Sequence, residues 1–150
     1  MANWCSNRLL VTGPAGSVRT FRDRAATVAD GMPTELSFGA FVPGPDDEEG
    51  RIDAWGCRFE AEDAKVSDHS DEAVEWRFLT PASPPIEWLE KVGPDHPELS
   101  FDLVFAEPMA GFAGRLFIER GGTVVAAEWT GKRARRELEA VGADELWLAS

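Results

Sequence analysis

Residues 72–92 constrain the fold more than any other stretch of this chain. Within them, residues 73–79 alternate between apolar and charged side chains, in the order Val74, Glu75, Trp76, Arg77 and Phe78. Alternation of aromatic and β-branched residues with charged residues predicts a strand with one buried face. Thr80 and Pro81 are expected to end this strand.

A helix is predicted directly after it. Ser83 stands at the N-cap position, where its hydroxyl can accept a backbone N–H, and Pro84 follows where a missing N–H costs nothing. An apolar stripe follows, and Gly93-Pro94 is expected to end the helix; the stripe consists of Ile86, Leu89 and Val92. A strand that leads into a helix is half of a split β-α-β unit.

The remaining periodicities supply the other half of such a unit. Strands are expected at residues 7–12, 61–67, 99–105, 115–119 and 123–129, the last two forming a hairpin around Gly121-Gly122. Helices are expected from a cap at Ser17 to about Asp30, with Val18, Phe21, Ala25 and Val28 on one face, and at residues 132–141. Residues 36–42 fit either a short strand or an extended packed segment, and residues 146–148 are expected to pack against the fold.

This order predicts an α+β fold, specifically a ferredoxin-like split β-α-β sandwich. Its antiparallel sheet would carry two helices on one face and would be extended by a C-terminal hairpin and helix, at about residues 107–150. A length of 150 residues is most simply one domain. We expect Trp4, Trp76 and Trp129 in the core and Trp88 at the edge of its helix.

The charge balance restricts the classes of partner. A net charge of −12 repels nucleic-acid phosphates, which argues against direct nucleic-acid binding, and it favours a basic protein partner. No apolar run approaches the roughly 20 residues of a membrane span, and no secretory signal is visible. We therefore expect a cytoplasmic protein without a membrane partner, in which Cys5 and Cys57 are free thiols.

The acidic residues concentrate in one connection. Residues 44–63 contain eight acidic residues and two arginines, and residues 47–51 are expected to form a mobile loop. Trp55 lies within this connection and is the best candidate for an exposed aromatic side chain that anchors a partner. The predicted binding residues are Trp55, Asp46, Asp47, Glu48, Glu49 and Asp53.

The sequence gives no catalytic, metal or cofactor signature. A nucleophilic cysteine needs a neighbouring base and a lowered pKa. Neither His69 nor His96 is near Cys5 in sequence, and the acidic loop around Cys57 would raise the pKa of that thiol. Residues 68–71 contain groups that can bind metals but fit a hairpin turn better, and residues 46–49 lack the ligand spacing of a calcium loop. We therefore expect no cofactor and no metal.

Three segments resemble the Api92-like proteins, a family associated with phages and plasmids. These segments are Asn3-Trp4-Cys5 with Asn7 and the strand that follows, Trp55-Gly56, and Thr80-Pro-Ala-Ser-Pro-Pro85. Cys57 and Pro81-Ala82 depart from the family pattern, and residues 107–150 match nothing in it. The resemblance implies a ferredoxin-like topology, and because the family has no established activity it implies no function.

Three functions follow as hypotheses. The first is a non-enzymatic acidic module from a mobile element that binds a basic protein. The second is a small-molecule-binding or hydrolytic enzyme with a cleft near Trp55 and Cys57. The third is an RNA-binding sheet surface, against which the acidic balance weighs.

Overall fold

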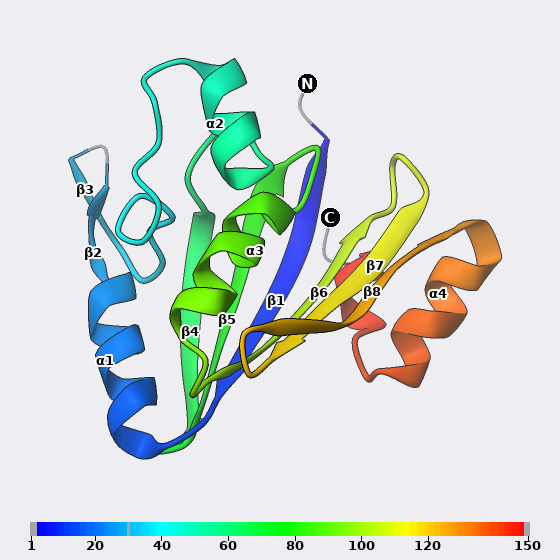
Figure 1. Cartoon of the computed structure of the whole chain (residues 1–150). Helices are drawn as coiled ribbons and strands as arrows, with labels where there is room; N and C mark the ends of the chain where they lie inside the picture. Colours follow the sequence, from blue (N-terminus) through cyan, green and yellow to red (C-terminus); the bar gives the residue numbers. More distant parts are fainter. Residues whose placement is uncertain (1–2, 30, 149–150) are drawn as a thin grey trace.

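The chain folds around one six-stranded antiparallel sheet (Figure 1). The computed structural model describes residues 3–29 and 31–148. In order across the sheet, the strands are β4 (Glu62–Ser70), β5 (Ala73–Pro81), β1 (Trp4–Thr12), β6 (Ser100–Glu107), β7 (Phe112–Glu119) and β8 (Gly122–Thr130). All neighbouring strands are antiparallel, and a separate hairpin pairs β2 (Thr27–Ala29) with β3 (Met32–Thr34). The fold is therefore α+β.

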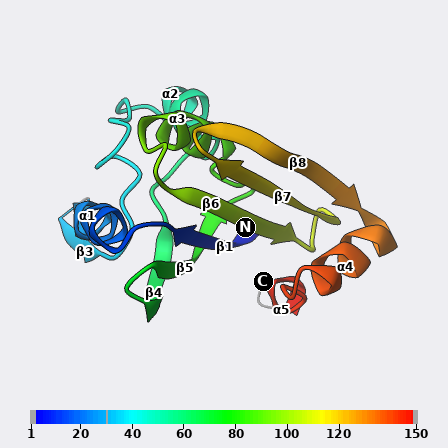
Figure 2. The same cartoon turned by 60° about the horizontal axis from the view of Figure 1, so that its bottom comes forward.

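Helices cover both faces of the sheet, as Figures 1 and 2 show together. The helices are α1 (Ala15–Ala25), α2 (Glu48–Trp55), α3 (Ile86–Asp95), α4 (Gly131–Ala140) and α5 (Glu145–Leu148). Helices α1 and α3 pack on one face of the sheet, and α4 and α5 pack on the opposite face of β1, β6, β7 and β8. We call these the α3 face and the α4 face.

The larger hydrophobic core lies on the α3 face and follows the alternation of the strands. In β5, Val74, Trp76 and Phe78 are buried while Arg77 is exposed. The Trp76 ring packs edge-on against Phe21 of α1, with ring centroids 5.7 Å apart. The alternating pattern of residues 73–79 is therefore confirmed as a strand with one buried face.

A smaller core lies on the α4 face. The intervening residues of β6 and β7, among them Val104, Ala106 and Ala113, pack there against Trp129 of β8. Leu138 of α4 and other apolar residues of the C-terminal segment close this cluster; the others are Ala134, Ala143 and Leu146. The expected packing of residues 146–148 is confirmed for Leu146, whereas Leu148 is largely exposed.

Helix α1 is shorter than predicted. It begins at Ala15, so Ser17 lies inside its first turn and does not cap it, and it ends at Ala25. Val28, predicted on the buried face of this helix, lies in β2 and is 65% exposed. Thr27 and Val28 are β-branched, which favours extended backbone; the predicted end at Asp30 lies outside the described residues. Residues 36–42 form a bent segment that contributes no strand, with Leu36 and Phe38 buried.

The predicted mobile loop at residues 47–51 is the beginning of α2. The Asp47 carboxylate caps this helix by accepting a hydrogen bond from the Gly50 N–H at 2.8 Å. Glu48 and Glu49 occupy the first turn, where acidic side chains interact favourably with the helix dipole. Gly56, with φ 91°, ends the helix in the left-handed conformation. Residues 47–51 are therefore ordered by their own side chains.

Helix α3 begins later than predicted and ends later. Its N-cap residue is Pro85, and the Ser83 hydroxyl donates instead to the Gly56 carbonyl oxygen at 2.6 Å. Pro94 lies within the last turn instead of beyond it. The hairpin between β7 and β8 also differs by one position, because Arg120 and Gly121 carry its positive φ angles, 54° and 78°, and Gly122 already pairs with Glu119.

Candidate functional site

Trp55, predicted as an exposed anchor, is buried. It lies in the last turn of α2 with 4% of its surface exposed, and its indole N–H donates to the Val42 carbonyl oxygen at 2.7 Å. Its ring packs against Phe38, with centroids 5.7 Å apart. Trp55 therefore attaches α2 to the core, and its side chain is closed to a partner.

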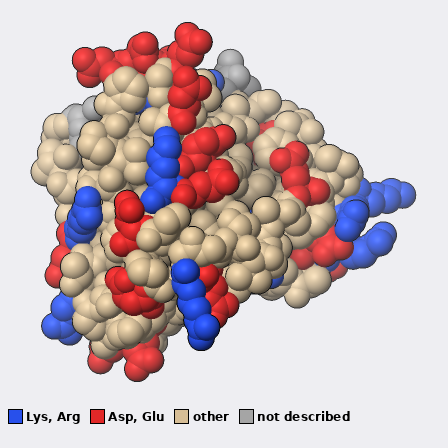
Figure 3. All heavy atoms as spheres, in the orientation of Figure 1, with Lys and Arg blue, Asp and Glu red and all other residues tan. Residues whose placement is uncertain are grey.

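The five acidic residues predicted with Trp55 stay at the surface of α2 and the turn before it. They are Asp46, Asp47, Glu48, Glu49 and Asp53, all exposed. Figure 3 shows acidic side chains gathered over α2. Because Trp55 is buried, these carboxylates do not form one surface site with its ring. Their contact with a partner stays a prediction.

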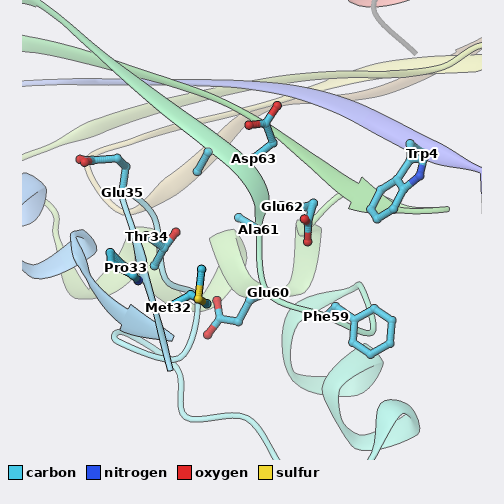
Figure 4. A pocket seen from close by; sticks show the side chains of 11 residues that line it. Trp4, Met32, Pro33, Thr34, Glu35, Phe59, Glu60, Ala61, Glu62 and Asp63 are labelled. Carbon is cyan, nitrogen blue, oxygen red and sulfur yellow. The ribbon is translucent and has the colours of Figure 1, made fainter. Parts of the chain in front are cut away.

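The aromatic side chains that do lie beside carboxylates surround a different hollow, which we call the acidic hollow. It has a volume of about 630 Å³ and opens between β3, the start of β1 and residues 59–64. Trp4 and Phe59 stand on one side, and Met32 and Thr34 stand on the other (Figure 4). The lining consists of Trp4, Met32, Pro33, Thr34, Glu35, Phe59, Glu60, Ala61, Glu62, Asp63 and Ala64.

Apolar side chains are unusually accessible around the acidic hollow. Trp4 is 36% exposed, Phe59 44% and Met32 68%. Trp4, predicted in the core, is the first residue of β1, opposite Pro81, and it is only partly buried. Exposed aromatic and methionine side chains of this kind are enriched where proteins bind partners.

Every charged residue that lines the acidic hollow is acidic. Glu35, Glu62 and Asp63 are exposed to solvent. Glu60 is engaged locally: its carboxylate accepts the backbone N–H groups of Phe38 and Gly39 at 2.6 and 3.0 Å. Glu60 therefore fixes the loop below the hollow, and the three exposed carboxylates set the charge of its rim.

Three cations lie beside the residues that line the hollow, and one of them, Arg58, lies over the Phe59 ring, 5.7 Å from its centroid. Arg51 donates to the carbonyl oxygens of Asp46 and Arg58, and its guanidinium lies 5.6 Å from the centroid of the Phe59 ring. Lys65 pairs with Asp63 at 3.7 Å, and both side chains are mostly exposed, so this pair contributes little to stability. Within the described part of the chain no salt bridge involves Glu35 or Glu62, although the charge of Glu35 acts on Arg22, so an incoming cation would meet these two exposed carboxylates.

Both thiols are buried, which removes support for a cleft around Cys57. Cys5 and Cys57 are 0% exposed and unpaired with each other. Burial raises the pKa of Cys57 to about 12, with a smaller contribution from Glu60, and burial also raises the pKa of Cys5. A thiol that stays protonated is a poor nucleophile. The side chains of Trp55 and Cys57 therefore line no accessible cleft, and the hypothesis of an enzyme at this place stays a prediction.

The reactivity of the two cysteines tests whether their thiols are buried. At neutral pH we expect neither cysteine of the folded protein to react with a disulfide reagent, and both to react after unfolding. Because folding raises the pKa of Cys57 above its ordinary value of 9.0, the fold favours the protonated thiol. Its contribution to stability is present below that value and is lost as the pH rises towards 12.

Urea unfolding at about pH 8 and about pH 11 measures this loss. In Cys57→Ala the free energy of unfolding should fall less between the two pH values than in the unchanged protein. The absence of tyrosine removes phenol ionisation from the comparison. An equal fall in both proteins would show that the Cys57 thiol is not the titrating group.

Three segments far apart in sequence meet in one hydrogen-bonded corner. The Asn7 side-chain amide donates to the Thr80 hydroxyl at 3.0 Å, and this hydroxyl donates to the Ser83 carbonyl oxygen at 2.7 Å. Ser83 in turn donates to Gly56, and the Ala82 N–H donates to the Asn3 carbonyl oxygen at 2.7 Å. These are the segments that carry the resemblance to the Api92-like proteins, and their shared role here is to satisfy buried polar groups.

The described residues contain neither a metal-binding cluster nor a helix that could cross a membrane. Among residues 3–29 and 31–148, no group of three or more histidine, cysteine or acidic residues is arranged to hold a metal ion. Likewise, none of the helices in the described part of the chain is long and apolar enough to cross a membrane.

The comparisons with known proteins identify a fold and no activity. No family model matches the sequence, and no curated protein matches it. Among solved structures, the crystal structure of a protein api92 from Yersinia pseudotuberculosis is similar, with a TM-score of 0.71 over 87% of this chain and 99% of that one, at 10% identity. Identity this low shows a common fold alone. The chain therefore has an Api92-like fold.

Proposed function

We propose that this chain is a non-enzymatic protein-interaction module whose acidic hollow binds a lysine- or arginine-rich segment of another protein. The observation that carries the proposal is the lining itself, in which every charged side chain is acidic and the aromatic rings of Trp4 and Phe59 are accessible. Aromatic anchors supply contact area, and surrounding carboxylates select a basic partner.

The net charge also supports binding of a basic partner. At −12, the whole surface attracts basic proteins over distances of about one Debye length, roughly 8–10 Å at physiological salt. The two exposed carboxylates at the rim, Glu35 and Glu62, would then fix the orientation of the bound segment. As a surrogate for nucleic acid, such a module would occupy the basic surface of a nucleic-acid-binding protein, a role in keeping with the proposed origin in a phage or plasmid.

We also propose that the first part of the fold is a ferredoxin-like unit. Strands β4, β5, β1 and β6 lie side by side in that order, and α1 and α3 share one face. This order supports a ferredoxin-like split β-α-β unit, to which β7, β8, α4 and α5 are a C-terminal extension.

Reversing two rim charges should abolish most of the binding. In Glu35→Lys with Glu62→Lys, we expect the affinity for a short lysine- and arginine-rich peptide to fall about 100-fold, because each close charge pair contributes about 1.5 kcal/mol or more. Fluorescence anisotropy of the labelled peptide, at low and at physiological salt, measures this affinity.

The matched control reverses Asp71 and Glu72, two exposed residues in the turn between β4 and β5. It changes the net charge by the same amount at a site outside the acidic hollow, so it should weaken binding only a few-fold. Equal losses in the two double variants would mean that the peptide senses only net charge. Affinity that does not change with salt would rule out electrostatic capture altogether.

A further inference from the structure

The two edges of the sheet are built differently. Edge strand β4 carries charged residues along its length and has two register shifts, one of them around Asp63, which has φ 52°. Charged residues and bulges on an edge prevent pairing with other chains. Edge strand β8 is nine residues long, contains no charged residue before Glu128, and leaves Val124 59% exposed. Strand β8 has one register shift, opposite Phe117 and Ile118 of β7, but it lacks the charged residues that protect β4.

A groove runs beside this unprotected edge. It lies between the beginning of α3 and strands β7 and β8 on the α3 face, and its volume is about 390 Å³. Its lining includes the apolar side chains of Phe105, Leu116 and Ala126. Three of the four charged residues in its lining are acidic, Glu87 and Glu90 of α3 and Glu128 of β8. The fourth, Arg115, pairs with Asp102 at 2.9 Å. In Figure 3, acidic side chains lie over α3 and again over the strands beside it.

The register of β8 shows which of its side chains lie on each face of the sheet, and therefore which side chains an added strand would contact. Glu128 pairs with Gly114 and Ala126 with Leu116, so both side chains lie on the α3 face beside the groove. Val125 and Ala127 lie on the opposite face. A strand added to β8 would continue this alternation, because residues on neighbouring strands share a face with their direct partners.

We infer that β8 accepts an additional strand from a partner protein, and that this strand alternates lysine or arginine with small apolar residues. Main-chain hydrogen bonds to the free edge of β8 would provide affinity, and the alternate side chains would provide specificity. The basic side chains would face Glu128 and the acidic rim across the groove, and the apolar ones would lie beside Val125 and Ala127.

Charge argues against a second copy of this chain as the occupant. A two-fold pairing of β8 with itself would join the two sheets with their α3 faces on the same side. Glu128 and the acidic rims of both copies would then face the same space, which raises the energy of the pair. A basic strand removes that repulsion. The inference goes beyond the acidic hollow, which adjoins β4 at the other edge of the sheet.

The test uses the full chain and a synthetic peptide of alternating lysine and valine. Amide hydrogen exchange measured by NMR should slow in β8 when the peptide is added, whether or not it also slows at residues 59–64 beside the acidic hollow, and should stay unchanged at residues 65–70 of β4. The same peptide with N-methyl groups at alternate residues keeps its charge but cannot form a ladder, and its affinity should be at least about tenfold lower. Equal binding of both peptides would overturn the inference.

Two variants test whether Glu128 is the charged residue that the peptide contacts. Glu128→Lys should weaken binding of the unmodified peptide about tenfold, whereas Glu119→Lys, an exposed residue on the α4 face at the end of β7, should change it less than about twofold. Slowed exchange confined to residues 59–64 would place the peptide in the acidic hollow and overturn the β8 site alone. Protection of β8 in the protein without peptide, together with a dimeric mass in solution, would show that a second copy occupies this edge instead.

Discussion

Replacing Trp76 by alanine is expected to lower the free energy of unfolding by about 3–5 kcal/mol, which is a large part of the stability of a domain this size. Trp76 is fully buried and packs against Phe21 of α1. Its indole N–H also donates to the Glu35 carbonyl oxygen at 2.9 Å. The substitution therefore opens a cavity beneath α1 and releases a segment that lines the acidic hollow.

Urea unfolding followed by circular dichroism measures this loss, with Trp4→Ala as the control. Trp4 is 36% exposed, whereas Trp76 is fully buried, so the removal of Trp4 should cost clearly less. Trp76→Phe separates the two contributions, because it keeps most of the packing and removes the hydrogen bond to Glu35. If Trp76→Ala and Trp4→Ala destabilise the protein equally, the large core is not centred on β5 as described.

Gly56→Ala should destabilise the protein by about 2–4 kcal/mol, although it adds a single methyl group. Gly56 has φ 91°, and a Cβ atom there would lie 2.9 Å from the Pro84 carbonyl oxygen and 3.0 Å from the Ile86 nitrogen. Both are backbone atoms at the start of α3, so relief of the clash requires α2 and α3 to separate. The hydrogen bond from Ser83 to the Gly56 carbonyl oxygen would be lost with that movement.

Gly111→Ala is the matched control for backbone strain. Gly111 has φ 79°, and nothing lies within 4 Å of an added Cβ, so only the left-handed conformation is penalised, by about 1–2 kcal/mol. The difference between the two variants in thermal or urea unfolding reports the contact between α2 and α3. Equal losses would mean that the two helices do not press on each other at Gly56.

The sequence was most informative where one periodicity extended over a whole element. Residues 73–79 and 99–105 alternate strictly, and both are strands of the large sheet. The apolar spacing of Ile86, Leu89 and Val92 likewise located α3. The predicted start of α3 is too early. Ser83 has a side chain suited to an N-cap, but its hydroxyl donates to the carbonyl oxygen of Gly56, which is close in space, instead of capping the helix.

The candidate site was harder to predict, since exposure depends on contacts between distant segments. Trp55 has acidic neighbours in sequence, yet α2 turns its ring towards Phe38 and Val42. A signal for α2 was present: Asp47 as a cap followed by Glu48 and Glu49 predicts a helix N-terminus, and this would have placed Trp55 in an ordered turn. No local pattern brings Trp4 and Met32 to the same hollow.

The sheet separates two clusters that meet only through its backbone. Successive residues of β6 serve different clusters: Leu103 and Phe105 pack on the α3 face, and Val104 and Ala106 pack on the α4 face. Among the described residues the two clusters have no member in common, so substitutions in one and in the other should have nearly additive effects on the free energy of unfolding. Such modularity lets the C-terminal layer diverge in sequence while the layer beneath α1 and α3 keeps its packing.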